Sequence, residues 1–364
     1  MANIFFLSQT SVSLLHTLQA KRLANFMESL SEPFWHVDTM AIYDPNWVCP
    51  ADEGGRDLCG YHRLTGQRIT QEILWPQIAQ QLPKQVDVLF LSDPALFWVV
   101  EEIFKIPAYQ NTKLAVDITQ QDISAALVKR ADIVFVSSQK LFDQVKSFTT
   151  KEVILVRDGV REGAVENYFL NKWKHRLPVF PWALYIVPED DAHKYKQTVD
   201  SFGGSLGCIP IDSRVVFANC AQYVLTKQFR DCAFGELNLS RLQTVGILSE
   251  PDCQAVTQLA PVYALGDFSA DDYFFITAQA LYSGARVIAY KQALKGFESF
   301  IDGQKVVAVE NASQFQDALR SALTKPPVTS MDQATHLHKP CDLLSARNSF
   351  ESVSSLLQSV LAVA

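Results

Sequence analysis

Short apolar runs alternate along this chain with segments in which apolar residues recur every three or four positions. Runs rich in β-branched residues are typical of strands buried on both faces of a parallel sheet, and the longer period is typical of the helices that join them. In the first half the pattern predicts strands at 3–8, 86–91, 113–117, 133–137 and 153–156. It predicts helices at 15–29, 69–81, 95–104, 121–130 and 139–147. Right-handed crossovers between such strands give a doubly wound, Rossmann-like half.

A second series of the same kind follows a turn-rich connection over 157–182. Its predicted strands are 183–187, 214–218, 243–246, 262–265, 286–290 and 305–309. Its predicted helices are 191–202, 251–260, 270–283, 294–301, 312–323 and 349–362. The fold class expected is therefore α/β, with two Rossmann-like doubly wound domains at 1–170 and 171–348 and a closing helix in 349–364. Because ligands of open α/β sheets bind at the carboxyl ends of the strands, we expect the two domains to face one cleft.

Composition narrows the class of protein. The 364 residues are 48% hydrophobic and 20% charged, as in soluble globular proteins, and the length suits two domains. A net charge of −7 disfavours broad nucleic-acid binding, and no apolar run approaches the roughly 20 residues that span a bilayer. The first residues lack the basic region of a signal peptide, and the 7 cysteines are scattered without a CxxC pair. These features predict a cytoplasmic protein with reduced thiols.

Several familiar motifs are missing. No GxGxxG follows the first strand, so a dinucleotide cofactor is not predicted, and there is no GxSxG nucleophile elbow. His336 and His338 have poor metal-ligand spacing without partners, so no metal site is predicted. The loop at 44–66 is long for an ordinary connection, which fits a functional segment.

The segment after the strand at 262–265 is a candidate ligand site. Gly266 opens a turn, Ser269 is the expected N-cap of the next helix, and Asp272 is an imperfect capping-box partner. A helix N-terminus at the carboxyl end of a strand offers backbone N–H groups to a phosphate. The alternative is a capped core helix with no ligand.

The order of these motifs resembles the GT-B glycosyltransferases. The stretch TVGILSEPDCQAVTQLAPVYALGDFSADDYFFITAQALYSGARVIAY resembles their donor-binding half, and FESFIDGQKVVAV resembles the segment that follows it. In the first half, RADIVFVSSQKLFDQVK and VILVRDGV resemble stretches of the same fold, and SARNSFESVSSLLQSVL resembles the closing helix that crosses back onto the first domain. The opening FFLSQTSVSLLHTLQAKRLANFM is similar to the xanthan glucuronosyltransferase and teichuronic-acid type.

The resemblance implies a donor site in the second domain for a UDP- or GDP-type sugar, with no other cofactor. These enzymes carry an acidic motif in which a Glu is followed by seven residues and then by a second Glu, which binds the ribose of the donor. In this chain the two Glu positions are occupied by Asp271 and Gln279. The resemblance also implies a Lys that binds phosphate three residues before Gln279, but this position is Ile276. Gln can still hydrogen-bond to ribose hydroxyls. Lys194 falls where these enzymes place a phosphate Lys, and Lys291 and Lys295 are further candidates. The donor residues expected are Gly266, Ser269, Asp271, Asp272, Tyr273, Phe275, Gln279 and Lys194.

The first domain is expected to bind the acceptor. An inverting transferase needs a general base near the acceptor hydroxyl, and the resemblance points to Asp117 or Asp122, although an Asp at a strand end is also an ordinary helix cap. His16 and Gln19 lie near the first turn, where the relatives contact substrate. Gly159, in an Arg-Asp-Gly turn, is expected to supply a positive φ.

The leading hypothesis is a metal-independent, cytoplasmic glycosyltransferase that serves cell-surface polysaccharide synthesis. Its acceptor would be a glycan or a lipid-linked sugar, with peripheral contact at the inner face of the membrane. The alternative is a GT-B-like subunit that supports another glycosyltransferase without catalysis, which Ile276 and Gln279 favour. A GT-B sugar epimerase is a third hypothesis, for which the sequence offers no clear set of acids and histidines.

Overall fold

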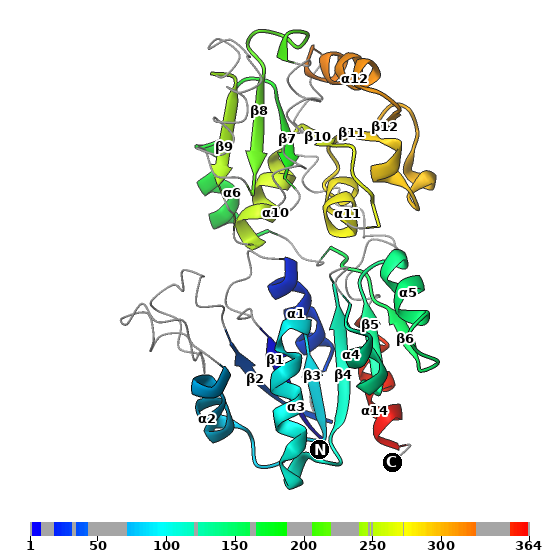
Figure 1. Cartoon of the computed structure of the whole chain (residues 1–364). Helices are drawn as coiled ribbons and strands as arrows, with labels where there is room; N and C mark the ends of the chain where they lie inside the picture. The colour runs from blue at the N-terminus through cyan, green and yellow to red at the C-terminus, as the bar shows by residue number, and fades with distance from the viewer. Residues whose placement is uncertain are drawn as a thin grey trace. The chain divides into compact units, whose positions relative to one another are not determined.

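The computed structural model describes residues 2–8, 18–30, 34–42, 71–119, 123–160, 165–187, 206–219, 240–246, 248, 250–271, 273–324 and 350–362. The chain forms two compact units. The N-terminal unit comprises Met1–Asp158 and Arg347–Ala364, and the C-terminal unit comprises Gly159–Ala346. Each unit contains one parallel sheet of six strands with helices on both faces (Figure 1).

The sheet of the N-terminal unit has the order β2-β1-β3-β4-β5-β6, with every pair parallel. Its strands are β1 (Ala2–Ser8), β2 (Trp35–Ala41), β3 (Val88–Leu91), β4 (Lys113–Ile118), β5 (Ile133–Val136) and β6 (Val153–Leu155). Five of these strands were predicted and β2 was not. It is an edge strand in which His36 and Asp38 interrupt the apolar run, so its sequence lacks the signature of a fully buried strand.

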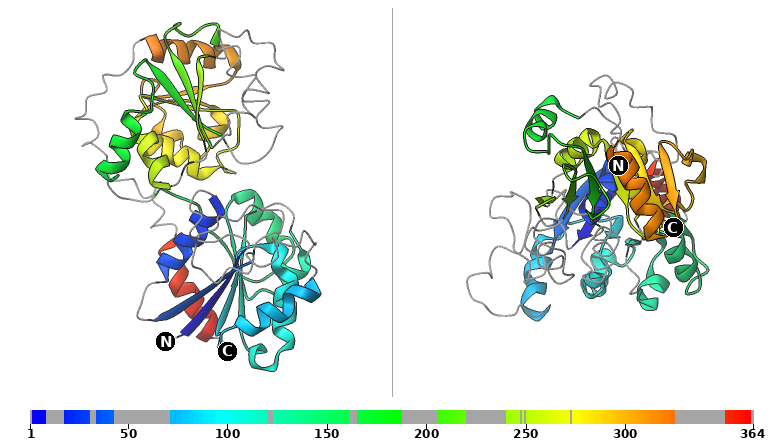
Figure 2. Two further views of the ribbon diagram at one scale, coloured as in Figure 1. Left: turned by 90° about the vertical axis from the view of Figure 1, so that its left-hand side faces the viewer. Right: turned by 90° about the horizontal axis from the view of Figure 1, so that it is seen from above.

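Two separate apolar layers cover the faces of this sheet. Helices α1 (Leu18–Ser29) and α14 (Val353–Ala362) cover one face, where Phe26 and Leu357 are fully buried. Figure 2 shows the blue α1 and the red α14 side by side on this face. The other face is covered by α2 (Gln71–Gln81), α3 (Phe97–Lys105), α4 (Ala125–Arg130) and α5 (Gln139–Lys146). Short 3-10 turns, η2 (Pro94–Leu96) and η3 (Pro107–Tyr109), flank α3.

The sheet of the C-terminal unit has the order β12-β11-β10-β7-β8-β9, again all parallel. Its strands are β7 (Trp182–Ile186), β8 (Arg214–Ala218), β9 (Leu242–Gly246), β10 (Val262–Leu265), β11 (Arg286–Tyr290) and β12 (Val306–Val309). All six were predicted. If β7 to β12 are numbered 1 to 6, the strand order is 3-2-1-4-5-6, which is that of the Rossmann fold.

Three helices of the C-terminal unit follow the prediction, while a helix at 167–174 forms within the segment 157–182, which was predicted to be a turn-rich connection. Helices α6 (Asn167–Lys174), α10 (Glu250–Leu259) and α11 (Phe274–Tyr282) lie on one face, and α12 (Ala312–Thr324) lies on the other. The predicted helix 294–301 is wrong, because the chain forms two 3-10 turns there, η4 (Lys291–Leu294) and η5 (Glu298–Phe300). Gly296 between them has a φ of 87°, which a continuous helix cannot accommodate. The predicted helix 191–202 and the loop 44–66 lie outside the described residues.

Candidate functional site

The carboxyl edge of the C-terminal sheet has its strand-order reversal between β7 and β10, the place where ligands of such sheets bind. Gly266 is the first residue after β10, and a Cβ at this position would lie 2.6 Å from the Oη of Tyr185. Tyr185 is fully buried in β7 and cannot move aside freely. Gly266 therefore lets the chain leave β10 close against this ring.

The turn that follows Gly266 is open to solvent in part. Asp267 is exposed, and Ser269, Asp271 and Tyr273 are half-buried. The Ser269 hydroxyl accepts a hydrogen bond from the backbone N–H of Asp271 at 3.2 Å, and the Ser269 carbonyl accepts one from the N–H of Tyr273 at 3.1 Å. The structure thus brings together four of the predicted donor residues, Gly266, Ser269, Asp271 and Tyr273, on one turn.

The helix after this turn begins later than predicted. We expected an N-cap at Ser269, but α11 starts at Phe274, and its N-cap is Tyr273 without a side-chain capping bond. Ser269 instead stabilises the turn, because its hydroxyl bonds only two residues ahead. Tyr273 itself gives α11 no side-chain cap, and the positive end of the α11 dipole lies at the carboxyl edge of the sheet.

Gln279 does not join the open turn. Its side chain is 2% exposed and lies against Cys253 of α10, with Nε2 3.6 Å and Oε1 3.8 Å from the sulfur. The spacing of Asp271 and Gln279 would place both on one helical face only if the helix began before Asp271. Because α11 begins at Phe274, the two residues do not share that face, and a ribose contact would require the Gln279 amide to leave Cys253.

The remaining donor candidates are placed as follows. Phe275 is half-buried in the first turn of α11, and Ile276 is buried. Lys291 is exposed and forms an ion pair with Glu310, which lowers the pKa of that carboxyl. Lys295 is exposed. Four predicted residues lie outside the described residues: His16, Asp122, Lys194 and Asp272. Gln19 lies in α1, and its side chain is outside the described part.

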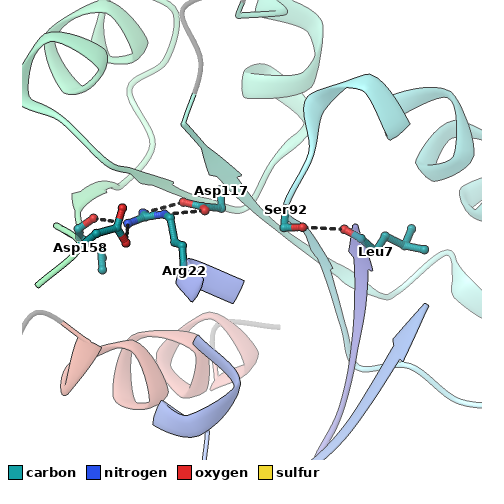
Figure 3. A network of polar contacts seen from close by, with 6 residues as sticks. Leu7, Arg22, Ser92, Asp117 and Asp158 are labelled. Atoms are coloured by element: carbon teal, nitrogen blue, oxygen red, sulfur yellow. Dashed lines mark hydrogen bonds and ion pairs between the residues drawn. The ribbon is translucent and has the colours of Figure 1, made fainter. Parts of the chain in front are cut away.

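The carboxyl edge of the N-terminal sheet holds a buried ion-pair network (Figure 3). The guanidinium of Arg22, on α1, donates from Nε and Nη2 to the two carboxylate oxygens of Asp117 on β4, both at 2.7 Å. Its Nη1 donates to the Val156 carbonyl at 2.6 Å and to Asp158, just after β6, at 3.0 Å. The Arg22 guanidinium also lies 5.1 Å from the ring centroid of Phe26. One arginine thus joins α1, β4 and the segment after β6.

Burial and charge act in opposite directions on this network. Burial raises the pKa of the Asp117 and Asp158 carboxyls, although the Arg22 guanidinium opposes that shift. Burial disfavours the charged form of Arg22, but the two carboxylates outweigh it and raise the pKa of the guanidinium. The Arg22 side chain is therefore a permanent cation between two carboxyl groups.

This geometry engages the Asp117 carboxylate. Both of its oxygens accept from Arg22 and the residue is 2% exposed, so an acceptor hydroxyl could bond to it only if Arg22 released an oxygen. Asp117 as the base stays a prediction. The Asp158 side chain is 21% exposed and engages Arg22 through one oxygen, so its carboxylate is more accessible than that of Asp117. Asp158 was not among the predicted site residues, and the available signal was an acid in the Arg-Asp-Gly turn directly after a predicted strand.

Two further searches of the described residues were negative. No group of three or more His, Cys, Asp or Glu side chains is placed to hold a metal ion in the part of the chain that the structure describes. Among the same residues, no helix is both long enough and apolar enough to cross a membrane.

Comparisons with known proteins give a match in structure and none in sequence. No protein-family model matches the chain, and no curated protein does. The sucrose-phosphate synthase of Thermosynechococcus elongatus superposes with a TM-score of 0.66 at 16% identity, covering 100% of both chains. Anabaena HepE in complex with UDP and glucose gives 0.59 at 11% identity, again over 100% of both chains. A UDP-forming trehalose-phosphate synthase of Burkholderia xenovorans, in complex with glucose-6-phosphate, gives 0.61 at 11% identity over 100% of both. The chain therefore has the GT-B fold, with two Rossmann-like domains.

Proposed function

We propose that this protein is a glycosyltransferase that takes a sugar from a nucleoside diphosphate sugar bound by the C-terminal unit. The observation that carries the proposal is the open turn from Gly266 to Tyr273. It leads from the carboxyl end of β10, beside the strand-order reversal, into the N-terminus of α11. Backbone N–H groups and the helix dipole at such a position favour a diphosphate. The UDP and glucose bound to Anabaena HepE support a UDP-type donor, and a GDP-type donor is the alternative.

Catalysis would then depend on stabilising the diphosphate as it leaves. The N-terminus of α11 supplies fixed dipoles for this purpose, and a metal ion is not part of the proposal. If the sugar is transferred with inversion, Asp158 is our candidate to accept the proton of the acceptor hydroxyl, because its carboxylate is partly exposed at the carboxyl edge of its sheet, and Asp117 and Asp122 are the other candidates. If the configuration is retained, no such base is needed, and Asp271 would lie near the sugar.

The acceptor part of the proposal is narrower and rests on the resemblance to the xanthan and teichuronic-acid enzymes. We propose a glycan or lipid-linked acceptor in cell-surface polysaccharide synthesis, with the reaction on the cytoplasmic side. The trehalose-phosphate synthase bound to glucose-6-phosphate favours a small sugar phosphate instead. An acceptor panel should therefore contain both classes.

A non-catalytic partner of another glycosyltransferase is the second candidate, and specific observations favour it. Ile276 stands where the phosphate Lys is expected and is buried, Gln279 is engaged by Cys253, and Asp117 is engaged by Arg22. A chain with this geometry could bind a donor without turning it over.

Calorimetric titration with UDP, GDP and UDP-glucose tests donor binding. We expect one of these ligands to bind, and Asp271→Ala to weaken it by roughly tenfold, since one polar contact accounts for about that factor. Asp317→Ala, an exposed acid on α12, is the matched control and should bind like the wild type. Failure of all three ligands to bind would remove the donor-site proposal and the transferase with it, and would favour the non-catalytic partner.

Turnover separates the two candidates. A transferase should release UDP or GDP from the bound donor in the presence of an acceptor, and Asp158→Asn should slow release by roughly 10²-fold or more if Asp158 is the base. Donor binding without release, over the whole acceptor panel, would instead support the non-catalytic partner.

A further inference from the structure

A basic groove crosses the amino edge of the N-terminal sheet, at the opposite ends of the strands from Asp117 and Asp158. It has a volume of about 670 Å³, within the range of ligand pockets in proteins. It lies at the starts of β4 and β5, at the end of α4 and beside Lys151, which comes shortly before β6. Its lining residues are Phe104, Gln110, Asn111, Thr112, Lys113, Leu114, Lys129, Arg130, Asp132 and Lys151.

The charge of this groove is opposite to that of the protein. Four cations line it, while Asp132 is its one acid, in a chain whose net charge is −7. An Asp132 oxygen already accepts the backbone N–H of Leu114 at 2.8 Å. Four cations against one carboxylate leave a local charge of about +3 at neutral pH.

Two of the four cations are held in place by neighbours. The Lys151 ammonium donates to the carbonyls of Lys129 and Ala131 at 3.0 and 2.6 Å. The Arg130 guanidinium lies 4.4 Å from the ring centroid of Phe104, a cation–π contact that restricts its movement. Fixed donors lose little conformational freedom on binding a ligand.

The other two cations have no acidic partner among the residues that the structure describes. Lys113 and Lys129 form no ion pair with any residue that the structure describes. Complementing the dipole of α4 is the ordinary explanation for Lys129 and Arg130 in its last turn. It does not explain Lys113, which begins a strand, or the concave arrangement of all four.

We propose that this groove binds an anion carrying two phosphate groups. Two phosphates carry roughly −3 to −4 at neutral pH, which matches the local positive charge. Arg130 can bind phosphate oxygens in a bidentate manner, while Lys113 and Lys129 act as mobile point charges around it. The ligand is either a soluble diphosphate or the phosphates of a lipid headgroup, which share this chemistry. The site is separate from the donor turn and does not depend on the proposed glycosyl transfer.

The test compares two variants with the same loss of charge. Lys129→Gln/Arg130→Gln removes two groove cations and keeps most of each side-chain stem. Lys105→Gln/Arg320→Gln removes two exposed cations elsewhere, each paired with an acid on its own helix. Circular dichroism confirms that both variants fold, and UDP titration confirms that the donor turn is unchanged.

Inorganic pyrophosphate is the soluble probe, titrated at low ionic strength. We expect binding to the wild type and the control, an affinity at least roughly tenfold weaker in the groove variant, and a further weakening with salt. Co-sedimentation with vesicles of cardiolipin, whose headgroup carries two phosphates, and with phosphatidylcholine vesicles for comparison, is the lipid probe. Loss of pyrophosphate binding in the groove variant assigns the groove to a soluble ligand, and loss of cardiolipin binding alone assigns it to a headgroup. Equal behaviour of the groove variant and the control, or no binding of either probe by the wild type, overturns the proposal.

Discussion

Replacing Arg22 by methionine should destabilise the protein strongly, because this side chain neutralises the buried Asp117. The substitution removes two 2.7 Å hydrogen bonds to Asp117, one to the Val156 carbonyl and one to Asp158. Methionine keeps the contact with Phe26 but leaves the Asp117 carboxylate, 2% exposed, without its cation. Breaking a buried ion pair from one side costs about 3–5 kcal/mol, which is roughly three orders of magnitude in the folding equilibrium.

The loss should depend on pH in a defined direction. Burial already raises the pKa of Asp117, and Arg22 opposes that shift, so Arg22→Met should raise this pKa further. A carboxyl with a raised folded-state pKa binds its proton more tightly when folded. The bound proton therefore stabilises the folded state below the ordinary carboxyl pKa of about 4, and this stabilisation is lost as the pH rises through the folded-state pKa. The deficit of Arg22→Met should therefore be small near pH 5 and large near about pH 8.

Urea unfolding followed by circular dichroism measures this deficit. Arg22→Met/Asp117→Leu should recover most of the loss, because replacing both ions with apolar groups is often neutral. Arg320→Met, at an exposed ion pair with Asp317, should cost less than about 1 kcal/mol. A loss below about 1 kcal/mol for Arg22→Met, or the same loss at both pH values, would refute the reasoning.

Three smaller predictions concern the C-terminal unit, each measured as a change in the free energy of unfolding in urea. Gly266→Ala should cost about 1–3 kcal/mol, since its Cβ meets the Tyr185 hydroxyl at 2.6 Å, and Tyr185→Phe in the same chain should recover part of the loss. An equal loss in the double variant would contradict this explanation. Asp252→Ala should cost about 1–2 kcal/mol, because one Asp252 oxygen accepts from an ammonium and an indole N–H of α6, both at 2.7 Å. An unchanged free energy of unfolding would mean that α6 packs on α10 without these bonds. Asp302→Ala should cost about 1 kcal/mol, because one Asp302 oxygen accepts three backbone N–H groups, at 2.9, 2.7 and 2.9 Å. These bonds lower the pKa of Asp302, so the stabilisation is present above about pH 4 and is lost as the pH falls through the folded-state pKa. If Asp302→Ala still lowered the free energy of unfolding at low pH, this explanation would be contradicted.

The carboxyl edge of each sheet has a different character, which bears on the proposed function. In the C-terminal unit, the turn from Gly266 to Tyr273 is partly exposed and leads into the N-terminus of α11. In the N-terminal unit, Arg22 joins three elements, and the side chain of Asp158 at the same edge is 21% exposed. In the proposed function, the first edge would hold the anionic donor and the second would offer a carboxylate.

The sequence by itself determined the two sheets, because the strand and helix periods are local and need no knowledge of the fold. It also predicted a turn directly after β10, since the end of a buried strand followed by glycine and acidic residues can be recognised from neighbouring residues. It missed β2, whose polar residues are tolerated because the strand lies at the edge of its sheet.

Only the tertiary structure decided which candidate side chains are available. Asp117 looked like a base at a strand end, but its partner Arg22 lies 95 residues away in the sequence. Gln279 looked like a ribose ligand, but it packs on Cys253, 26 residues earlier and on another helix. Periodicity predicts which face of an element is buried, but the partner of a buried polar group is set by packing between elements distant in the chain. The chemistry of such a residue is therefore fixed only when those elements meet.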